Sequence, residues 1–131
     1  MGQKAKNKKG EYFRNNVWWW RNLWFFVCLN CGRFLTREEM DYGNWNAGKK
    51  IVKPKAGKIV KKLKETIENG TAKKFEIEIS KIIITAKIHN RKLEKGMTDP
   101  NYEINEHYPF TVENLKGFIQ FVENSGGFRI F

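Results

Sequence analysis

The chain has 131 residues, with 25 lysines and arginines against 14 acidic residues and a formal net charge of +11. This length suits one domain whose hydrophobic core needs no disulfide or metal to hold it together. No apolar stretch is long enough to span a membrane, and no apolar segment typical of a secretory signal is present, so we expect a cytoplasmic protein without membrane contact. Residues 1–95 carry 23 basic and 9 acidic side chains. Such a charge favours anionic partners, although lysines also serve solubility alone.

The first twenty residues show no helical pattern. Residues 1–10 are polar and lysine-rich without an apolar period, which predicts a mobile basic arm in front of one globular domain over residues 11–131. Residues 11–20 are rich in aromatic side chains without helical spacing, so we expect an extended or irregular segment there.

Two helices and a turn follow. Residues 21–31 fit a helix that Gly32 ends. Thr36 and Glu39 form a capping-box pattern, which predicts a short helix that ends at Gly43. Residues 42–50 contain two glycines and two asparagines around a tryptophan, which is typical of a turn that carries an aromatic side chain.

The second half of the chain predicts three more helices. Pro54 suits the first turn of a helix that runs to about Asn69 and is closed by Gly70, with one apolar stripe and an opposite face that is nearly all lysine. Residues 71–94 alternate like a strand in places, but they lack any turn signal, which favours one long helix. Residues 96–109 should form a loop, and Thr111 should cap a helix from Val112 to about residue 124. The apolar tail, residues 128–131, must dock somewhere. The expected fold is mainly α-helical with possible short strands (α+β).

The cysteines Cys28 and Cys31 form the only C-x-x-C pair. Zinc would need two further ligands, and the only histidines, His89 and His107, stand at unrelated spacing. We therefore favour two buried thiols that pack as small apolar side chains over a metal site or a redox pair. The sequence has no nucleophile elbow, phosphate-binding glycine loop, dinucleotide fingerprint or zinc-protease motif, so we expect neither catalysis nor a cofactor.

The most unusual feature is a run of four tryptophans within residues 18–24, flanked by arginines. Tryptophan rings can stack on a flat ligand, while arginine and lysine hold phosphate and asparagine reads polar ring edges. The candidate ligand-binding residues are Arg14, Asn16, Trp18, Trp20, Arg21, Asn44, Trp45, Asn46, Lys49, Lys50 and Lys53. The alternative is that the tryptophans pack in the core, which the helical spacing of Trp24 with the cysteines favours for that residue.

Three segments resemble a family of small, largely uncharacterised proteins of phages and prophages: YFRNNVWWWRNLWFFVCLNC, GNWNAG, and YPFTVENLKGFIQFVENSGGFRI. Members of that family carry proline where Asn22 stands and a second cysteine pair that completes a zinc-binding set with Cys28 and Cys31. This chain has no second pair. The resemblance implies a phage protein that acts on host macromolecules or host signals.

Three functions are compatible with these features. The first is a sponge that captures an anionic, nucleotide-like ligand, such as an immune signalling nucleotide, as a counter-defence. The second is nucleic-acid binding through the basic arm and the lysine-rich helix. The third is an inhibitor that docks on a host defence protein through its aromatic patch. A homo-oligomer is also compatible with the first function, because small sponges often build pockets between subunits.

Overall fold

The computed structural model of the chain describes residues 2–7, 12–45, 50–94, 96, 108–124 and 127–130, and it describes side chains at 19–41, 51–92, 96 and 108–124. The fold is mainly helical with short strands, as the sequence predicts. The helices are α1 (Val17–Cys31), α2 (Arg37–Trp45), α3 (Lys53–Glu68), α4 (Thr71–Glu94) and α5 (Val112–Glu123), with a short 3₁₀ helix, η1 (Gly32–Phe34). The strands are β1 (Gly2–Asn7), β2 (Tyr12–Asn16), β3 (Lys50–Val52) and β4 (Gly127–Ile130).

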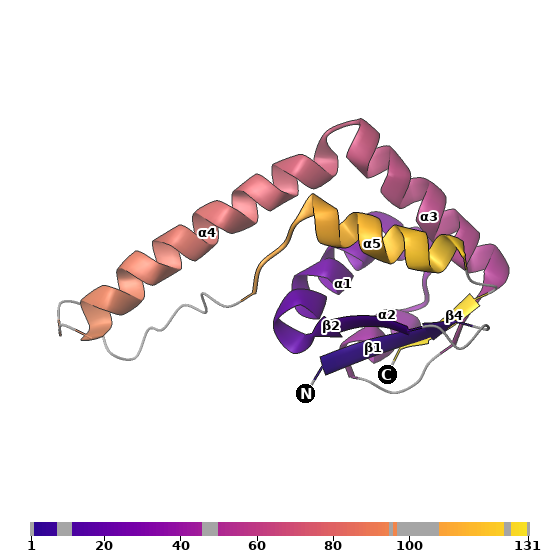
Figure 1. Ribbon diagram of the computed structural model, residues 1–131, viewed down its shortest axis with the longest axis horizontal. Helices are drawn as coiled ribbons and strands as arrows, with labels where there is room; N and C mark the ends of the chain where they lie inside the picture. Colours follow the sequence, from indigo (N-terminus) through magenta and orange to yellow (C-terminus); the bar gives the residue numbers. More distant parts are fainter. Residues whose placement is uncertain are drawn as a thin grey trace.

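The described strands form one antiparallel sheet in the order β2-β1-β4-β3. Ala5 of β1 lies opposite Phe13 on one side and Ile130 on the other. Ile51 of β3 lies opposite Phe128 of β4. The sheet therefore joins the two ends of the chain, and β4 gives the C-terminal tail the docking place that its apolar sequence requires (Figure 1).

The N-terminal segment differs from the expected arm without regular structure. Gly2–Asn7 forms β1, which pairs with strands on both of its sides. Strand pairing uses the backbone N–H and C=O groups, so a lysine-rich segment without an apolar period can still enter a sheet. The mobility of the segment stays a prediction.

Helix α1 begins at Val17, four residues earlier than the spacing predicts, so the tryptophan run lies inside a helix and not in an irregular segment. Tryptophan has only a modest helix propensity, and tertiary burial outweighs it here. One face of α1 is buried in the core. It consists of residues three or four positions apart: Trp20, Leu23, Trp24 and Val27.

The other helices follow their sequence signals. In the capping box the backbone N–H of Glu39 donates to Thr36 Oγ1 at 3.0 Å, while the N–H of Thr36 donates to Glu39 Oε1 at 2.8 Å. Gly70, at φ +84°, separates α3 from α4. Residues 71–94 form one long helix, as predicted. The hydroxyl of Thr111 accepts a hydrogen bond from the N–H of Asn114 at 3.1 Å and caps α5.

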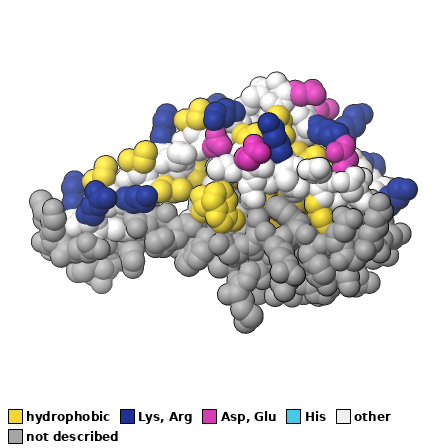
Figure 2. Space-filling model, in the orientation of Figure 1, with side chains coloured by type: hydrophobic (Ala, Val, Ile, Leu, Met, Phe, Trp, Pro, Cys, Tyr) yellow, Lys and Arg dark blue, Asp and Glu magenta, His cyan; other side chains and the backbone are white. Residues whose placement is uncertain are grey.

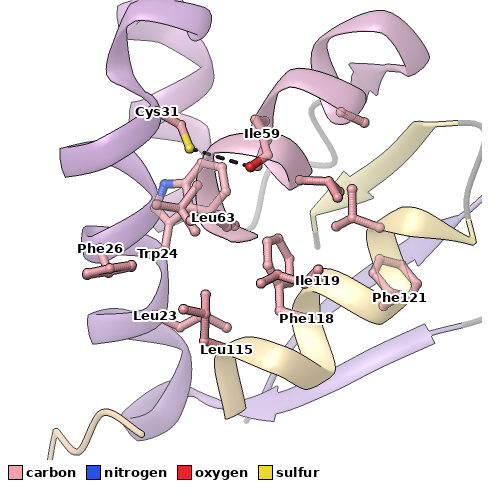
Figure 3. Packing of buried hydrophobic residues seen from close by; sticks show 14 of the residues in the cluster. Leu23, Trp24, Phe26, Cys31, Ile59, Leu63, Leu115, Phe118, Ile119 and Phe121 are labelled. Atoms are coloured by element: carbon pink, nitrogen blue, oxygen red, sulfur yellow. Dashed lines mark hydrogen bonds between the residues drawn. The ribbon is translucent and has the colours of Figure 1, made fainter. Parts of the chain in front are cut away.

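The hydrophobic core lies where α1, α3 and α5 meet (Figures 1 and 3). Leu23 of α1, Leu63 of α3 and Leu115 of α5 are fully buried there. The thiol of Cys31 donates to the backbone carbonyl of Ile59 at 3.9 Å, a weak bond between α1 and α3. An aromatic contact joins α4 to this core. The centre of the Phe75 ring lies 5.0 Å from the centre of the Phe26 ring.

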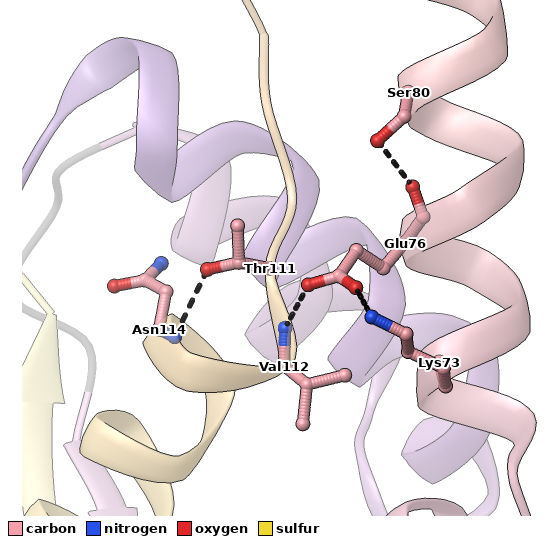
Figure 4. A network of polar contacts seen from close by, with 6 residues as sticks. All are labelled: Lys73, Glu76, Ser80, Thr111, Val112 and Asn114. Carbon is pink, nitrogen blue, oxygen red and sulfur yellow. Dashed lines mark hydrogen bonds and ion pairs between the residues drawn. The ribbon is translucent and has the colours of Figure 1, made fainter.

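A polar contact fixes the start of α4 against the start of α5 (Figure 4). The carboxylate of Glu76 accepts a hydrogen bond from Lys73 and another, at 3.0 Å, from the backbone N–H of Val112. The bond from Lys73 contributes most to lowering the pKa of Glu76 below its ordinary value, and the bond from Val112 adds to it against a smaller opposing effect of burial. Glu76 is thus held in its charged form at the junction of the two helices.

Candidate nucleic-acid interface

Trp20 and Trp24 belong to the core. Their exposed fractions are 2% and 0%, and their rings stack on each other with centroids 5.6 Å apart. The ring of Phe118 meets Trp20 edge-on at 5.8 Å, and the indole N–H of Trp24 donates to the carbonyl of Met40 at 2.9 Å. The core position expected for Trp24 is confirmed. The ligand-stacking role predicted for Trp20 is corrected, because both faces of a ring that is buried in this way are closed to a ligand.

Two further candidate residues have described side chains. Arg21 is exposed, lies 4.9 Å from the centre of the Tyr108 ring and donates to its hydroxyl at 3.1 Å. Lys53 is exposed at the first position of α3. It lines a cavity of about 180 Å³ together with Gly57 and Glu123. Pockets that enclose a small organic ligand usually measure about 300–1,000 Å³, so this cavity is too small for a nucleotide.

The remaining candidate side chains lie outside the described ones, and their roles stay predictions. They are Arg14, Asn16, Trp18, Asn44, Trp45, Asn46, Lys49 and Lys50. The backbone is described for some of them. Helix α2 continues two residues past Gly43, so Asn44 and Trp45 end a helix where a turn was expected.

The outer face of α3 carries the lysines that the sequence places opposite its apolar stripe. Ala56, Ile59, Val60, Leu63 and Thr66 are buried on the inner face. On the other side, Lys53, Lys58, Lys61 and Lys64 are exposed, and no acidic residue interrupts them before Glu65. Lys58, Lys61 and Lys64 follow one another at spacings of three residues, which produces a basic ridge on one side of the helix.

The 3₁₀ helix η1 adds an aromatic ring and a further cation to this ridge. The guanidinium of Arg33 lies 5.8 Å from the centre of the Phe34 ring, and the ammonium of Lys58 lies 6.0 Å from it. Phe34 is half-buried and Arg33 is exposed. We call the group formed by Arg33, Phe34, Lys58, Lys61 and Lys62 the α3–η1 surface.

The sequence did not point to Arg33 or Phe34 as candidate binding residues. The available signal is Gly32, which directly follows the last residue of α1 and begins η1. Their position beside Lys58 depends on how α1 packs against α3, which no local pattern encodes.

The cations of this surface differ in how far they are neutralised. Lys62 lies 3.6 Å from the carboxylate of Glu65, one helical turn away. Lys55 and Lys64, beside the surface, pair with Glu39 and Glu123. Among the described side chains, Arg33, Lys58 and Lys61 have no acidic partner within ion-pair distance. These three cations are the ones that remain available to an anion.

Cys31 is buried against α3 and Cys28 is half-buried, and both are protonated thiols. Burial raises the pKa of Cys31 to about 12, with a smaller contribution from Cys28 and an opposing one from Lys62. Burial, followed by the charge of Asp41, also raises the pKa of Cys28 to about 12. In the part of the chain that the structure describes, no three His, Cys, Asp or Glu side chains come together as a metal site requires.

Comparison with protein-family models, with curated proteins and with solved structures gives no match to this chain. No helix within the described residues combines the length and the apolar character that crossing a lipid bilayer requires.

Proposed function

We propose that this protein is a non-catalytic nucleic-acid-binding protein that holds single-stranded nucleic acid on the α3–η1 surface. One observation supports the proposal most directly. The Phe34 ring has the guanidinium of Arg33 and the ammonium of Lys58 beside it. Surfaces that bind single strands combine a basic path for the backbone with aromatic rings on which bases stack. The α3–η1 surface has both components within one turn of α3.

The chemistry divides between the two kinds of side chain. Arg33, Lys58 and Lys61 would form charge-assisted hydrogen bonds to phosphate oxygens. Phe34 is half-buried and packs against the core, and its accessible part would contact a base, an interaction worth about 1–3 kcal/mol per base for a full stack. Neither contact reads sequence, so the expected binding tolerates many sequences and weakens as salt is added.

Capture of a single nucleotide has less support from the described residues. Trp20 is closed to ligands, and the cavity beside Lys53 is too small for a nucleotide. That hypothesis now depends on Trp18, Trp45 and their polar neighbours. From the sequence resemblance to phage proteins, we also propose that the protein acts in the cytoplasm of a bacterial host.

A pair of matched variants tests the proposal. Binding of a fluorescently labelled oligothymidylate is measured by anisotropy for the wild-type chain, for Lys58→Ala/Lys61→Ala and for Lys74→Ala/Lys116→Ala. Both double variants lose two exposed lysines and thus the same charge, but the second pair lies on α4 and α5. We expect at least about tenfold weaker binding for the α3 pair alone. Equal weakening in both variants would show that only net charge matters and would contradict the proposal.

A competition arm distinguishes the polymer from a small nucleotide. Unlabelled oligothymidylate should displace the labelled strand, whereas a cyclic dinucleotide or ADP-ribose should not do so at the same nucleotide concentration. Displacement by a cyclic dinucleotide at lower concentration than by the oligonucleotide would favour nucleotide capture instead.

A further inference from the structure

Among the described residues, the side chains of α4 that belong to the main core cluster lie near the beginning of the helix. Ala72 is fully buried in the core, while Phe75 and Ile79 pack against it from the first turns of the helix. Beyond Ile79, no described side chain of α4 belongs to that core cluster, although Ala86 is fully buried. The helix continues to Glu94 as an arm that extends away from the other helices (Figure 1).

One side of this arm carries an exposed apolar stripe. Ile77, Ile84 and Ile88 have exposed fractions of 45%, 59% and 51%. Together with Lys81 they follow a spacing of four, three and four residues, which aligns them along about 16 Å of one helix face. The stripe is one side chain wide. Such a narrow stripe is typical of a seam between two helices, whereas a helix that lies on a lipid surface needs a broad apolar face.

Most of the exposed charged side chains along the stripe are basic. Lys81 lies within it and Lys74, Lys87, Arg91 and Lys92 lie beside it, whereas near its start Lys73 pairs with Glu76 and Glu78 is exposed. From residue 79 to residue 92 the sequence has no acidic residue. Figure 2 shows basic and hydrophobic side chains intermixed along the α4 arm.

We propose that the outer stripe of α4 binds an acidic amphipathic helix of another protein. Charges beside an apolar seam select the partner, because opposite charges attract across it and like charges repel. The basic borders therefore fit a helix whose own apolar seam is flanked by Glu or Asp. A second copy of this chain would bring the lysines and arginines of residues 79–92 against each other, which opposes self-association through this face. This inference does not depend on the α3–η1 surface.

The test uses the full chain and a defined probe. The probe is a labelled peptide of three heptads with Leu at the a and d positions and Glu at the e and g positions, and a peptide of the same composition in scrambled order is the control. The variants are Ile84→Ser and Ile82→Ser. Ile82 is 53% exposed on the same helix but points to the opposite side, so it is a matched control for Ile84. We expect the heptad peptide to bind, with Ile84→Ser about tenfold weaker and Ile82→Ser unchanged within about twofold.

A charge-reversal variant gives an independent readout. In Lys81→Glu/Lys87→Glu the preference should shift from the Glu peptide to the same peptide with Lys at e and g, while the circular dichroism of the chain stays unchanged. The proposal is overturned if the scrambled peptide binds equally well, or if Ile84→Ser binds as tightly as the wild type. Two further results would overturn it. The first is self-association in analytical ultracentrifugation that Ile84→Ser abolishes. The second is binding to vesicles of anionic phospholipid that Ile84→Ser abolishes, while the peptide does not bind.

Discussion

The ammonium of Lys58 on α3 lies 6.0 Å from the centre of the Phe34 ring on η1, and Arg33 approaches the same ring at 5.8 Å. The contact joins two segments 24 positions apart in the chain. It places an aromatic face within a row of cations that have no acidic partner among the described side chains. Attraction between a cation and a ring is worth about 0.5–1 kcal/mol at an exposed site, so the arrangement is held weakly.

Removal of the Phe34 ring should weaken oligonucleotide binding while the cations remain. We expect about tenfold weaker binding for Phe34→Ala, since stacking of one base contributes about 1–3 kcal/mol. Phe34→Tyr keeps the ring and should bind like the wild type. Anisotropy titration measures both variants, and circular dichroism checks that each one is folded. If the two variants bind equally, the ring has no part in binding.

Truncation of Trp20 should affect folding and not a ligand contact. Trp20→Ala should lower the free energy of unfolding by about 3–5 kcal/mol, because it leaves a large cavity beside Trp24 and Phe118. Leu29→Ala on the same helix is the control, since Leu29 is 64% exposed and should lose less than about 1 kcal/mol. Urea denaturation gives both values. If Trp20→Ala keeps the wild-type stability but binds oligonucleotide more weakly, Trp20 contacts the ligand and the core assignment is wrong.

Two glycines should respond to alanine in opposite directions. Gly57 lies inside α3 with open space where a Cβ would stand, so Gly57→Ala should stabilise the chain by about 0.5–1 kcal/mol. Gly70 also has open space, but its φ of +84° is unfavourable for any side chain, so Gly70→Ala should cost about 1–2 kcal/mol. Thermal unfolding compares the two variants. Stabilisation by Gly70→Ala would contradict the turn conformation between α3 and α4.

Acid should destabilise the chain partly through Glu39. Burial would raise the pKa of this carboxyl, but hydrogen bonds from Lys55 and from the backbone N–H of Thr36 together outweigh burial and lower it. A folded-state pKa below the unfolded one means that the stabilisation is complete above the unfolded pKa and is lost as the pH falls through the folded pKa.

Glu39→Gln should therefore lose less stability than the wild type between neutral pH and about pH 3. The readout is the urea midpoint at each pH. The control is Glu65→Gln, which removes an exposed carboxylate that lies 3.6 Å from Lys62 and should follow the wild-type profile. If the wild type and Glu39→Gln lose the same stability between neutral pH and about pH 3, Glu39 is not a source of the pH dependence.

Local chemistry in the sequence was enough to predict most helices. The capping box of Thr36 and Glu39, the glycine at position 70 and the Thr111 cap each act within a few residues, so their patterns are readable from the chain alone. The sheet was not predictable in this way, because β1 and β4 meet from opposite ends of the chain.

The candidate site shows the same limit. The lysine face of α3 follows from helical periodicity, and the structure has those lysines exposed. The tryptophan run was ambiguous between core and ligand platform, and burial of Trp20 against Trp24 and Phe118 assigns it to the core. The position of Phe34 depends on contact between η1 and α3, which is a tertiary relationship.

The salt dependence of oligothymidylate binding by the wild-type chain tests the central claim most directly. Each phosphate contact on a single strand contributes about 0.7 to the slope of log affinity against log salt, so engagement of Arg33, Lys58 and Lys61 predicts a slope of about −2. In Lys58→Ala/Lys61→Ala the slope should fall to about −0.7. A wild-type slope near zero, or an unchanged slope in the double variant, would contradict binding of nucleic acid on the α3–η1 surface.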